Sequence, residues 1–139
     1  MSHATANKAI LENAYRRWNE TRGDSVEELL DICAEEILWG SLAGGVKPLA
    51  FTAKAVGKSD VRNYFEGLLA AWSMNYYNVD YFVAEDDRVV VVGSTKWTNK
   101  QTGKACETPK TDIWRFRDGR AIEFFEYYDT AQILDAAKP

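Results

Sequence analysis

The sequence predicts an α+β fold in which helices cover one face of an antiparallel sheet. Two observations lead to this prediction. The apolar residues of the first half recur with the period of a helix, and after Trp72 the period changes to that of a strand. The 139 residues also have the length of one domain and contain no internal repeat or linker. We therefore expect residues 1–139 to form a single domain.

A pair of helices opens the predicted fold. Apolar side chains on one face of the first helix are Leu11, Ala14, Tyr15 and Trp18. Gly23 is the predicted stop of this helix. Ser25 and Glu28 have the spacing of a capping box at the start of the second helix. Its solvated end is predicted at Glu35 and Glu36.

A short strand, an irregular segment and a third helix follow. The strand is expected over residues 37–42. Residues 42–57 contain Pro48 and Gly57 and are typical of either a loop or an edge strand. Ser59 is the predicted cap of the third helix.

The remaining sequence predicts an antiparallel meander with a short final helix. Strands are expected over residues 75–84, 88–98, 105–117 and 122–128. Asp118-Gly119 lies between two of these patterns and is a strong hairpin signal. Asp129 with Gln132 predicts the N-cap of the last helix.

Composition and charge exclude several classes of function. The chain has 17 basic and 21 acidic residues, which argues against binding to nucleic acid or to an anionic membrane surface. The start of the sequence is polar and has no signal-peptide pattern, so we expect a cytoplasmic protein in which Cys33 and Cys106 stay reduced. No glycine-rich nucleotide motif is present, and His3 is the only histidine. No cofactor and no metal are therefore expected.

One stretch of sequence carries a family resemblance. Residues 111–120 read TDIWRFRDGR, and residues 126–129 read EYYD. With the order of elements, this pattern resembles the NTF2-like superfamily, and within it the SnoaL-like polyketide cyclases and ketosteroid isomerase. The resemblance extends from about Ala9 to Ala136. It implies a cone-shaped, curved sheet wrapped around the N-terminal helices, a ligand pocket, and a homodimer formed through the outer face of the sheet, where Ile113, Arg115 and Arg117 would lie.

The resemblance also implies roles for particular residues. Asp112 occupies the position at which ketosteroid isomerase keeps an aspartic acid protonated to donate a hydrogen bond to the enolate oxygen. Tyr15 lies within one residue of the position of that enzyme's hydrogen-bonding tyrosine. The position of its general base falls on Ser41, and a serine cannot shuttle the proton. This departure argues against ketosteroid isomerase activity itself.

A carboxyl pair is the leading hypothesis for the chemistry. Alternation along the last strand groups Glu126 with Phe124 and Tyr128, and the resemblance places that face in the pocket. Asp112 as donor or acid and Glu126 as base suit proton abstraction next to a carbonyl, with Tyr15 or Tyr128 as a second donor. The other predicted ligand-binding residues are Trp39, Ser41, Trp97 and Trp114. We expect an enzyme that acts on a small apolar carbonyl compound such as a polyketide, steroid-like or terpenoid ring, by isomerisation, cyclisation or dehydration.

Alternative interpretations remain open at this point. Asp112 faces solvent if the strand parity is reversed, or it pairs with Lys110 or Arg115. Glu126 alternatively pairs across strands with Arg115 or Arg120. The alternative for the whole chain is a non-catalytic domain that binds a small molecule or another protein.

Overall fold

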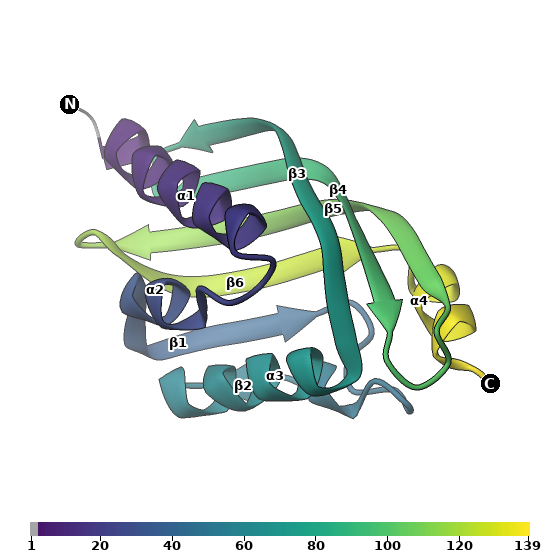
Figure 1. Ribbon diagram of the computed structural model, residues 1–139. Coiled ribbons are helices and arrows are strands. Elements are labelled where there is room, and N and C mark those ends of the chain that lie inside the picture. Colours follow the sequence, from purple (N-terminus) through teal and green to yellow (C-terminus); the bar gives the residue numbers. More distant parts are fainter. Residues whose placement is uncertain (1–2) are drawn as a thin grey trace.

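The computed structural model describes residues 3–139 and contains one six-stranded sheet with four α-helices (Figure 1). The helices are α1 (His3–Glu20), α2 (Val26–Asp31), α3 (Lys58–Ala71) and α4 (Thr130–Ala137), with a 3-10 turn η1 at Ala50–Thr52. The strands are β1 (Cys33–Ser41), β2 (Ala55–Val56), β3 (Trp72–Glu85), β4 (Arg88–Asn99), β5 (Ala105–Arg117) and β6 (Arg120–Tyr128). The predicted order of two helices, a strand, a helix and a meander is confirmed.

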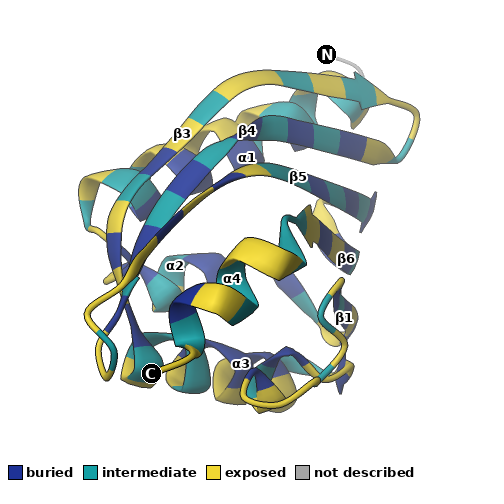
Figure 2. Ribbon diagram, turned by 90° about the vertical axis from the view of Figure 1, so that its right-hand side faces the viewer, coloured by how far each residue is buried: buried dark blue, intermediate teal, exposed yellow. Residues whose placement is uncertain are grey.

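The sheet is mixed and strongly curved. Its strand order is β2-β1-β6-β5-β4-β3, and β1 pairs in parallel with β6 while every other pairing is antiparallel. The long strands bend around the N-terminal helices and α3 (Figure 1). Figure 2 shows α4 at the open end of this curve, where it packs against β4 and β5. The inner face of the sheet therefore faces the helices, and a cavity lies between them.

Strand alternation decides which side chains enter that space. In β5 the even-numbered residues from Cys106 to Phe116 point inward, while Arg115 and Arg117 lie on the outer face. In β6 the inward residues include Phe124 and Glu126. The predicted parity of both strands is confirmed.

One glycine allows two strands of the curve to approach closely. A Cβ at Gly93 in β4 would lie 1.9 Å from the backbone oxygen of Asn78 in β3. The register of these strands shifts between Val79 and Tyr81, next to this contact. A side chain at residue 93 is therefore incompatible with the irregularity that helps to bend the sheet.

The predicted caps of two helices are wrong, although the predicted start of α2 directly after Ser25 is confirmed. Ser25 makes no capping hydrogen bond to α2, and Glu28 instead pairs with Arg17, whose Nε lies 3.0 Å from its Oε1. The helix α3 begins at Lys58 with Gly57 as its N-cap, so Ser59 lies inside it. The N-cap at Asp129 is confirmed, because its Oδ1 accepts the backbone N–H of Gln132 at 3.1 Å.

The segment from 33 to 57 also differs from the prediction. Glu35 and Glu36 belong to β1, which begins at Cys33, and are not a helix end. Residues 42–57 contain both predicted alternatives, because η1 interrupts a loop and β2 pairs as an edge strand with β1. In residues 3–139 no helix is long and apolar enough to cross a membrane.

Candidate functional site

Two inward-facing carboxylates meet on adjacent strands. Asp112 of β5 and Glu126 of β6 are register partners, and both are buried, at 2% and 5% exposure. A buried polar side chain is costly unless it has partners, so their surroundings determine what they can do. The alternatives in which Asp112 faces solvent or Glu126 pairs with an outer-face arginine are thereby excluded.

A lysine with 11% of its side chain exposed bridges the two carboxylates. The Lys110 Nζ lies 2.6 Å from the Asp112 Oδ1 and 2.9 Å from the Glu126 Oε1. It also donates to the Tyr77 hydroxyl at 3.2 Å. The ammonium group has three protons, and these three acceptors use all of them.

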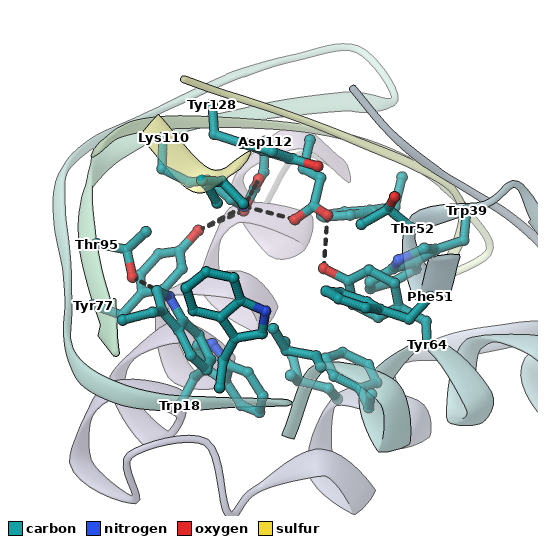
Figure 3. A pocket seen from close by; sticks show the side chains of 18 of the residues that line it. Trp18, Trp39, Phe51, Thr52, Tyr64, Tyr77, Thr95, Lys110, Asp112 and Tyr128 are labelled. Atoms are coloured by element: carbon teal, nitrogen blue, oxygen red, sulfur yellow. Dashed lines mark hydrogen bonds and ion pairs between the residues drawn. The ribbon is translucent and has the colours of Figure 1, made fainter. Parts of the chain in front are cut away.

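Three tyrosine hydroxyls complete the network. Tyr15 and Tyr77 donate to the Asp112 Oδ2, the latter at 2.9 Å. Tyr64 donates to the Glu126 Oε2 at 2.6 Å. The Tyr15 hydroxyl in turn accepts the indole N–H of Trp114 at 2.9 Å. Residues from α1, α3, β3, β5 and β6 therefore hold the two carboxylates in fixed positions (Figure 3).

Burial and charge shift the pKa values of these donors. Burial alone acts to lower the pKa of Lys110, but Asp112 and Glu126 outweigh it and hold that pKa well above its ordinary value. Burial raises the pKa of Tyr15 and of Tyr64 well above the ordinary value, and the neighbouring carboxylate adds to each shift. The lysine is thus a cation, and the tyrosines are neutral donors, at physiological pH.

This arrangement differs from the one that the resemblance to ketosteroid isomerase implies for Asp112. Its two oxygens accept from three donors, Tyr15, Tyr77 and Lys110. All three are donors and one of them, Lys110, is a cation, so the Asp112 carboxyl group acts as an acceptor in this network. Asp112 is therefore the common acceptor that holds these three donor groups in position.

The network forms one end of an aromatic cavity of about 90 Å³. Figure 3 shows Trp18, Trp39 and Tyr64 around this space, with Asp112 and Lys110 at its polar end. Trp39 stacks on Phe124 with ring centroids 3.8 Å apart. Pockets for drug-sized ligands usually measure roughly 300–1,000 Å³, so this space suits a compact ligand, and a steroid-sized one requires the walls to move.

The structure places eight of the nine predicted site residues on this cavity. These residues are Tyr15, Trp39, Trp97, Asp112, Trp114, Phe124, Glu126 and Tyr128. Ser41 is the exception. Its Oγ lies 2.5 Å from the Tyr128 hydroxyl, which also accepts the backbone N–H of Ala43 at 3.2 Å. Ser41 thus positions Tyr128 and does not line the cavity.

Sequence reasoning missed three members of the network. The alternative in which Asp112 pairs with Lys110 is confirmed, but this lysine is not among the predicted pocket residues, although the alternation that selects Asp112 also places residue 110 on the inner face. Tyr64 lies on the apolar face of α3, where the sequence pattern indicates only core packing. Tyr77 lies in β3, and its sequence context indicates no more than a strand residue. Within residues 3–139 no three potential ligands among histidine, cysteine and acidic residues are grouped to hold a metal ion.

Comparisons with known proteins agree with this architecture. An NTF2-like protein of unknown function from Burkholderia pseudomallei K96243 is similar over the whole length of both chains, with a TM-score of 0.83 and 21% identity. TerC co-crystallised with polyporic acid is similar over 96% of this chain and 99% of its own length, with a TM-score of 0.79 and 18% identity.

A third solved structure is a protein with a ketosteroid isomerase-like fold from Catenulispora acidiphila DSM 44928, in complex with trimethylamine. It covers 92% of this chain and 91% of its own, with a TM-score of 0.75 and 14% identity. No curated protein matches the sequence significantly. The SnoaL-like domain matches residues 11–124, which include Asp112 and most of the sheet and end two residues before Glu126. The chain belongs to the SnoaL-like domain family.

Proposed function

We propose that this chain is a cofactor-independent enzyme that binds a small, largely apolar carbonyl compound and moves a proton next to the carbonyl group. The observation that carries the proposal is the pair of buried carboxylates, Asp112 and Glu126, joined by Lys110 at the polar end of an aromatic cavity. Paired carboxyl groups in a water-poor site are suited to acid–base chemistry. The SnoaL-like fold, shared with polyketide cyclases and isomerases, supports the same class of reaction.

Glu126 is the proposed base. Its two oxygens each accept one hydrogen bond, from Lys110 and from Tyr64, so each retains a lone pair for a further proton. Glu126 takes a proton from the carbon next to the carbonyl, and the electron pair of that C–H bond moves into the enolate. The negative charge passes from Glu126 to the substrate oxygen, and the total charge of the site stays constant.

Lys110 is the proposed stabiliser of the enolate. Before the transfer all three of its protons are engaged, and one of them is held by Glu126. When Glu126 becomes protonated its hold on that ammonium proton weakens, and the proton becomes available to the enolate oxygen. Asp112 keeps the lysine in place through the 2.6 Å contact, and Tyr15 fixes Asp112 from the other side. Return of the proton from Glu126 to a different carbon completes an isomerisation, and cyclisation or dehydration share the same first step.

The test follows exchange of the α-protons of small ketones with deuterated solvent by NMR, beginning with cyclohexenone and 1-indanone. We expect the wild type to accelerate exchange of at least one ketone and Glu126→Gln to lose that acceleration. Glu123→Gln is the matched control, because it removes the same charge from the outer face of the same strand. Equal rates for wild type and Glu126→Gln would exclude Glu126 as the base.

One observation favours a second candidate function, a domain that binds a small molecule without converting it. The network is internally satisfied, as it is in a purely structural polar cluster, because Lys110 and the three tyrosines all have protein partners. This alternative predicts ketone binding without any acceleration of α-proton exchange. The same assay with a binding measurement therefore separates the two functions.

The proposal extends to assembly and compartment. The outer face of the sheet exposes Phe125 and Tyr127, whose rings lie 4.9 Å apart, and Leu38. A homodimer through this face is supported by these apolar side chains, and Phe125→Glu is expected to weaken it in sedimentation. Sedimentation of the wild type as a monomer alone would contradict it. The proposed compartment is the cytoplasm, in keeping with two buried, unpaired cysteines.

A further inference from the structure

At the polar end of the cavity the protein groups that remain free are acceptors, so a ligand binds there through a hydrogen-bond donor. The three protons of Lys110 are engaged, and the hydroxyls of Tyr15, Tyr64 and Tyr77 already donate to carboxylates. A ligand that approaches this end with an acceptor therefore finds these four donors occupied.

The remaining hydroxyls on the cavity wall follow the same pattern. The three threonines that line it donate to backbone oxygens, at 2.9 Å or less, and these residues are Thr52, Thr95 and Thr108. Tyr128 is an exception, since either it or Ser41 supplies the proton that they share. The indole N–H of Trp39, on the side wall, is a buried donor that has no partner within residues 3–139. Acceptor capacity is different, because a carboxylate oxygen has two lone pairs and each oxygen of Glu126 accepts a single bond.

The charge of the lining points the same way. Among the residues that line the cavity, Lys110 is the only basic side chain and Asp112 and Glu126 are the only acidic ones, a formal excess of one acidic group. A buried charge without a counter-charge is costly, so a cation that enters the cavity removes that cost. An anion meets the opposite balance.

The walls suit a cation as well. Indole and phenol faces attract cations, and the Lys110 Nζ already lies 5.5 Å from the ring centroid of Tyr77 and 5.9 Å from that of Phe124. Away from the network the lining is formed mostly by further aromatic rings, among them Trp18, Phe65, Trp72 and Trp97. An ammonium group beside Glu126 thus keeps apolar or aromatic contacts on its other sides.

We infer that the natural ligand of this cavity carries a protonated amine, which binds beside Glu126 through the free lone pair of one carboxylate oxygen and leaves that of the other oxygen for the transferred proton. The inference rests on the proposed function for its site, and it narrows the substrate to an amine-bearing carbonyl compound with a small apolar body. It concerns which ligand is held and is independent of whether a proton is transferred.

Three probes that share a phenyl ring and differ in charge test the inference: benzylammonium, benzyl alcohol and benzoate, titrated by calorimetry at neutral pH. We expect benzylammonium to bind about tenfold or more tightly than benzyl alcohol, and benzoate to show no measurable binding. In Glu126→Gln, benzylammonium should bind no more tightly than benzyl alcohol, whereas in Glu123→Gln the difference in affinity between the two probes should remain. The wild-type series decides the matter even when Glu126→Gln does not fold.

Binding of benzyl alcohol or benzoate as tight as that of benzylammonium overturns the inference, and so does a lack of benzylammonium binding at millimolar concentration. Neither result touches the α-proton exchange of ketones, which tests the proposed reaction. The two proposals can therefore fail separately.

Discussion

Lys110 and Asp112 are two residues apart on the same face of β5, and the lysine Nζ lies 2.6 Å from the aspartate Oδ1. Residues two apart on a strand lie on the same face, and the long lysine side chain leans along the strand to reach the carboxylate. Glu126, the register partner of Asp112, supplies the second acceptor that holds the lysine over both strands. The site is therefore a property of the β5–β6 pairing as well as of its residue types.

Removal of the lysine should be strongly destabilising. Lys110→Met leaves two buried carboxylates facing each other without a counter-charge, which should lower the free energy of unfolding by about 3–5 kcal/mol. Chemical denaturation measures the change, and the exposed Lys104→Met is the control. The double variant Lys110→Met/Glu126→Gln should recover part of the loss. A single variant as stable as the wild type would show that the two carboxylates do not depend on Lys110.

Alkaline pH should destabilise the fold through the same groups. The pKa values of Lys110, Tyr15, Tyr64 and Tyr77 are raised in the folded state, so each group binds its proton more tightly when folded. Their stabilisation is complete below the unfolded pKa of about 10 and is lost as pH rises from there toward the folded values. Urea denaturation between neutral pH and pH ~11 should show this fall.

A tyrosine pair provides the control for that pH dependence. Tyr77→Phe should make the alkaline loss of stability shallower, because one buried phenol is gone, whereas Tyr81→Phe removes an exposed phenol and should leave the slope unchanged. Identical slopes for the wild type and Tyr77→Phe would refute the assignment.

Alanine substitution at the first residue of two predicted helix caps, Asp129 and Ser25, should lower the free energy of unfolding by different amounts. Asp129→Ala removes an observed cap of α4 and should cost about 1 kcal/mol in the free energy of unfolding. Ser25→Ala should cost less than about 0.5 kcal/mol, because the Ser25 Oγ is buried and has no hydrogen-bond partner. Equal losses in thermal or chemical denaturation would mean that Ser25 caps α2 after all.

The curvature of the sheet can be tested with two glycines. Gly93→Ala places a Cβ against the backbone of β3 and should destabilise the protein by about 2 kcal/mol or more. Gly40→Ala in β1 meets only the ring of Phe125, 2.5 Å from the ideal Cβ, and this exposed side chain can turn away. Gly40→Ala should therefore be the milder change in a denaturation experiment, and the reverse order would contradict the close approach of β3 and β4.

The sequence predicts those features of the site that depend on the alternation of residues along a single strand. Alternation along β5 and β6 is a backbone property, so it placed Asp112, Trp114, Phe124 and Glu126 on the inner face before their partners were known. The element order and the Asp118-Gly119 turn were predictable for the same reason, because their signals lie within a few residues.

The remaining features depend on contacts between distant elements. Tyr64 and Tyr77 reach the carboxylates from α3 and β3, and no local pattern distinguishes them from packing residues. The signature Ser25-Glu28 failed because Glu28 pairs with Arg17 of the preceding helix. The resemblance to ketosteroid isomerase predicts Ser41 in the pocket, whereas its hydroxyl is hydrogen-bonded to that of Tyr128. Lys110 lies on an inner face because two carboxylates, one of them on the neighbouring strand, pair with its charge.

The most direct test of the central claim, that the Lys110-bridged carboxylates face a ligand space, is an absorbance titration with 4-nitrophenol, whose neutral and ionised forms absorb at different wavelengths. Because the donors of the network are engaged and the carboxylates can accept, we expect binding of the neutral phenol, seen as a loss of phenolate absorbance when protein is added. Glu126→Gln should weaken this response and Glu123→Gln should preserve it. Absence of any spectral change, a gain of phenolate absorbance, or the same response in wild type and Glu126→Gln would contradict the account.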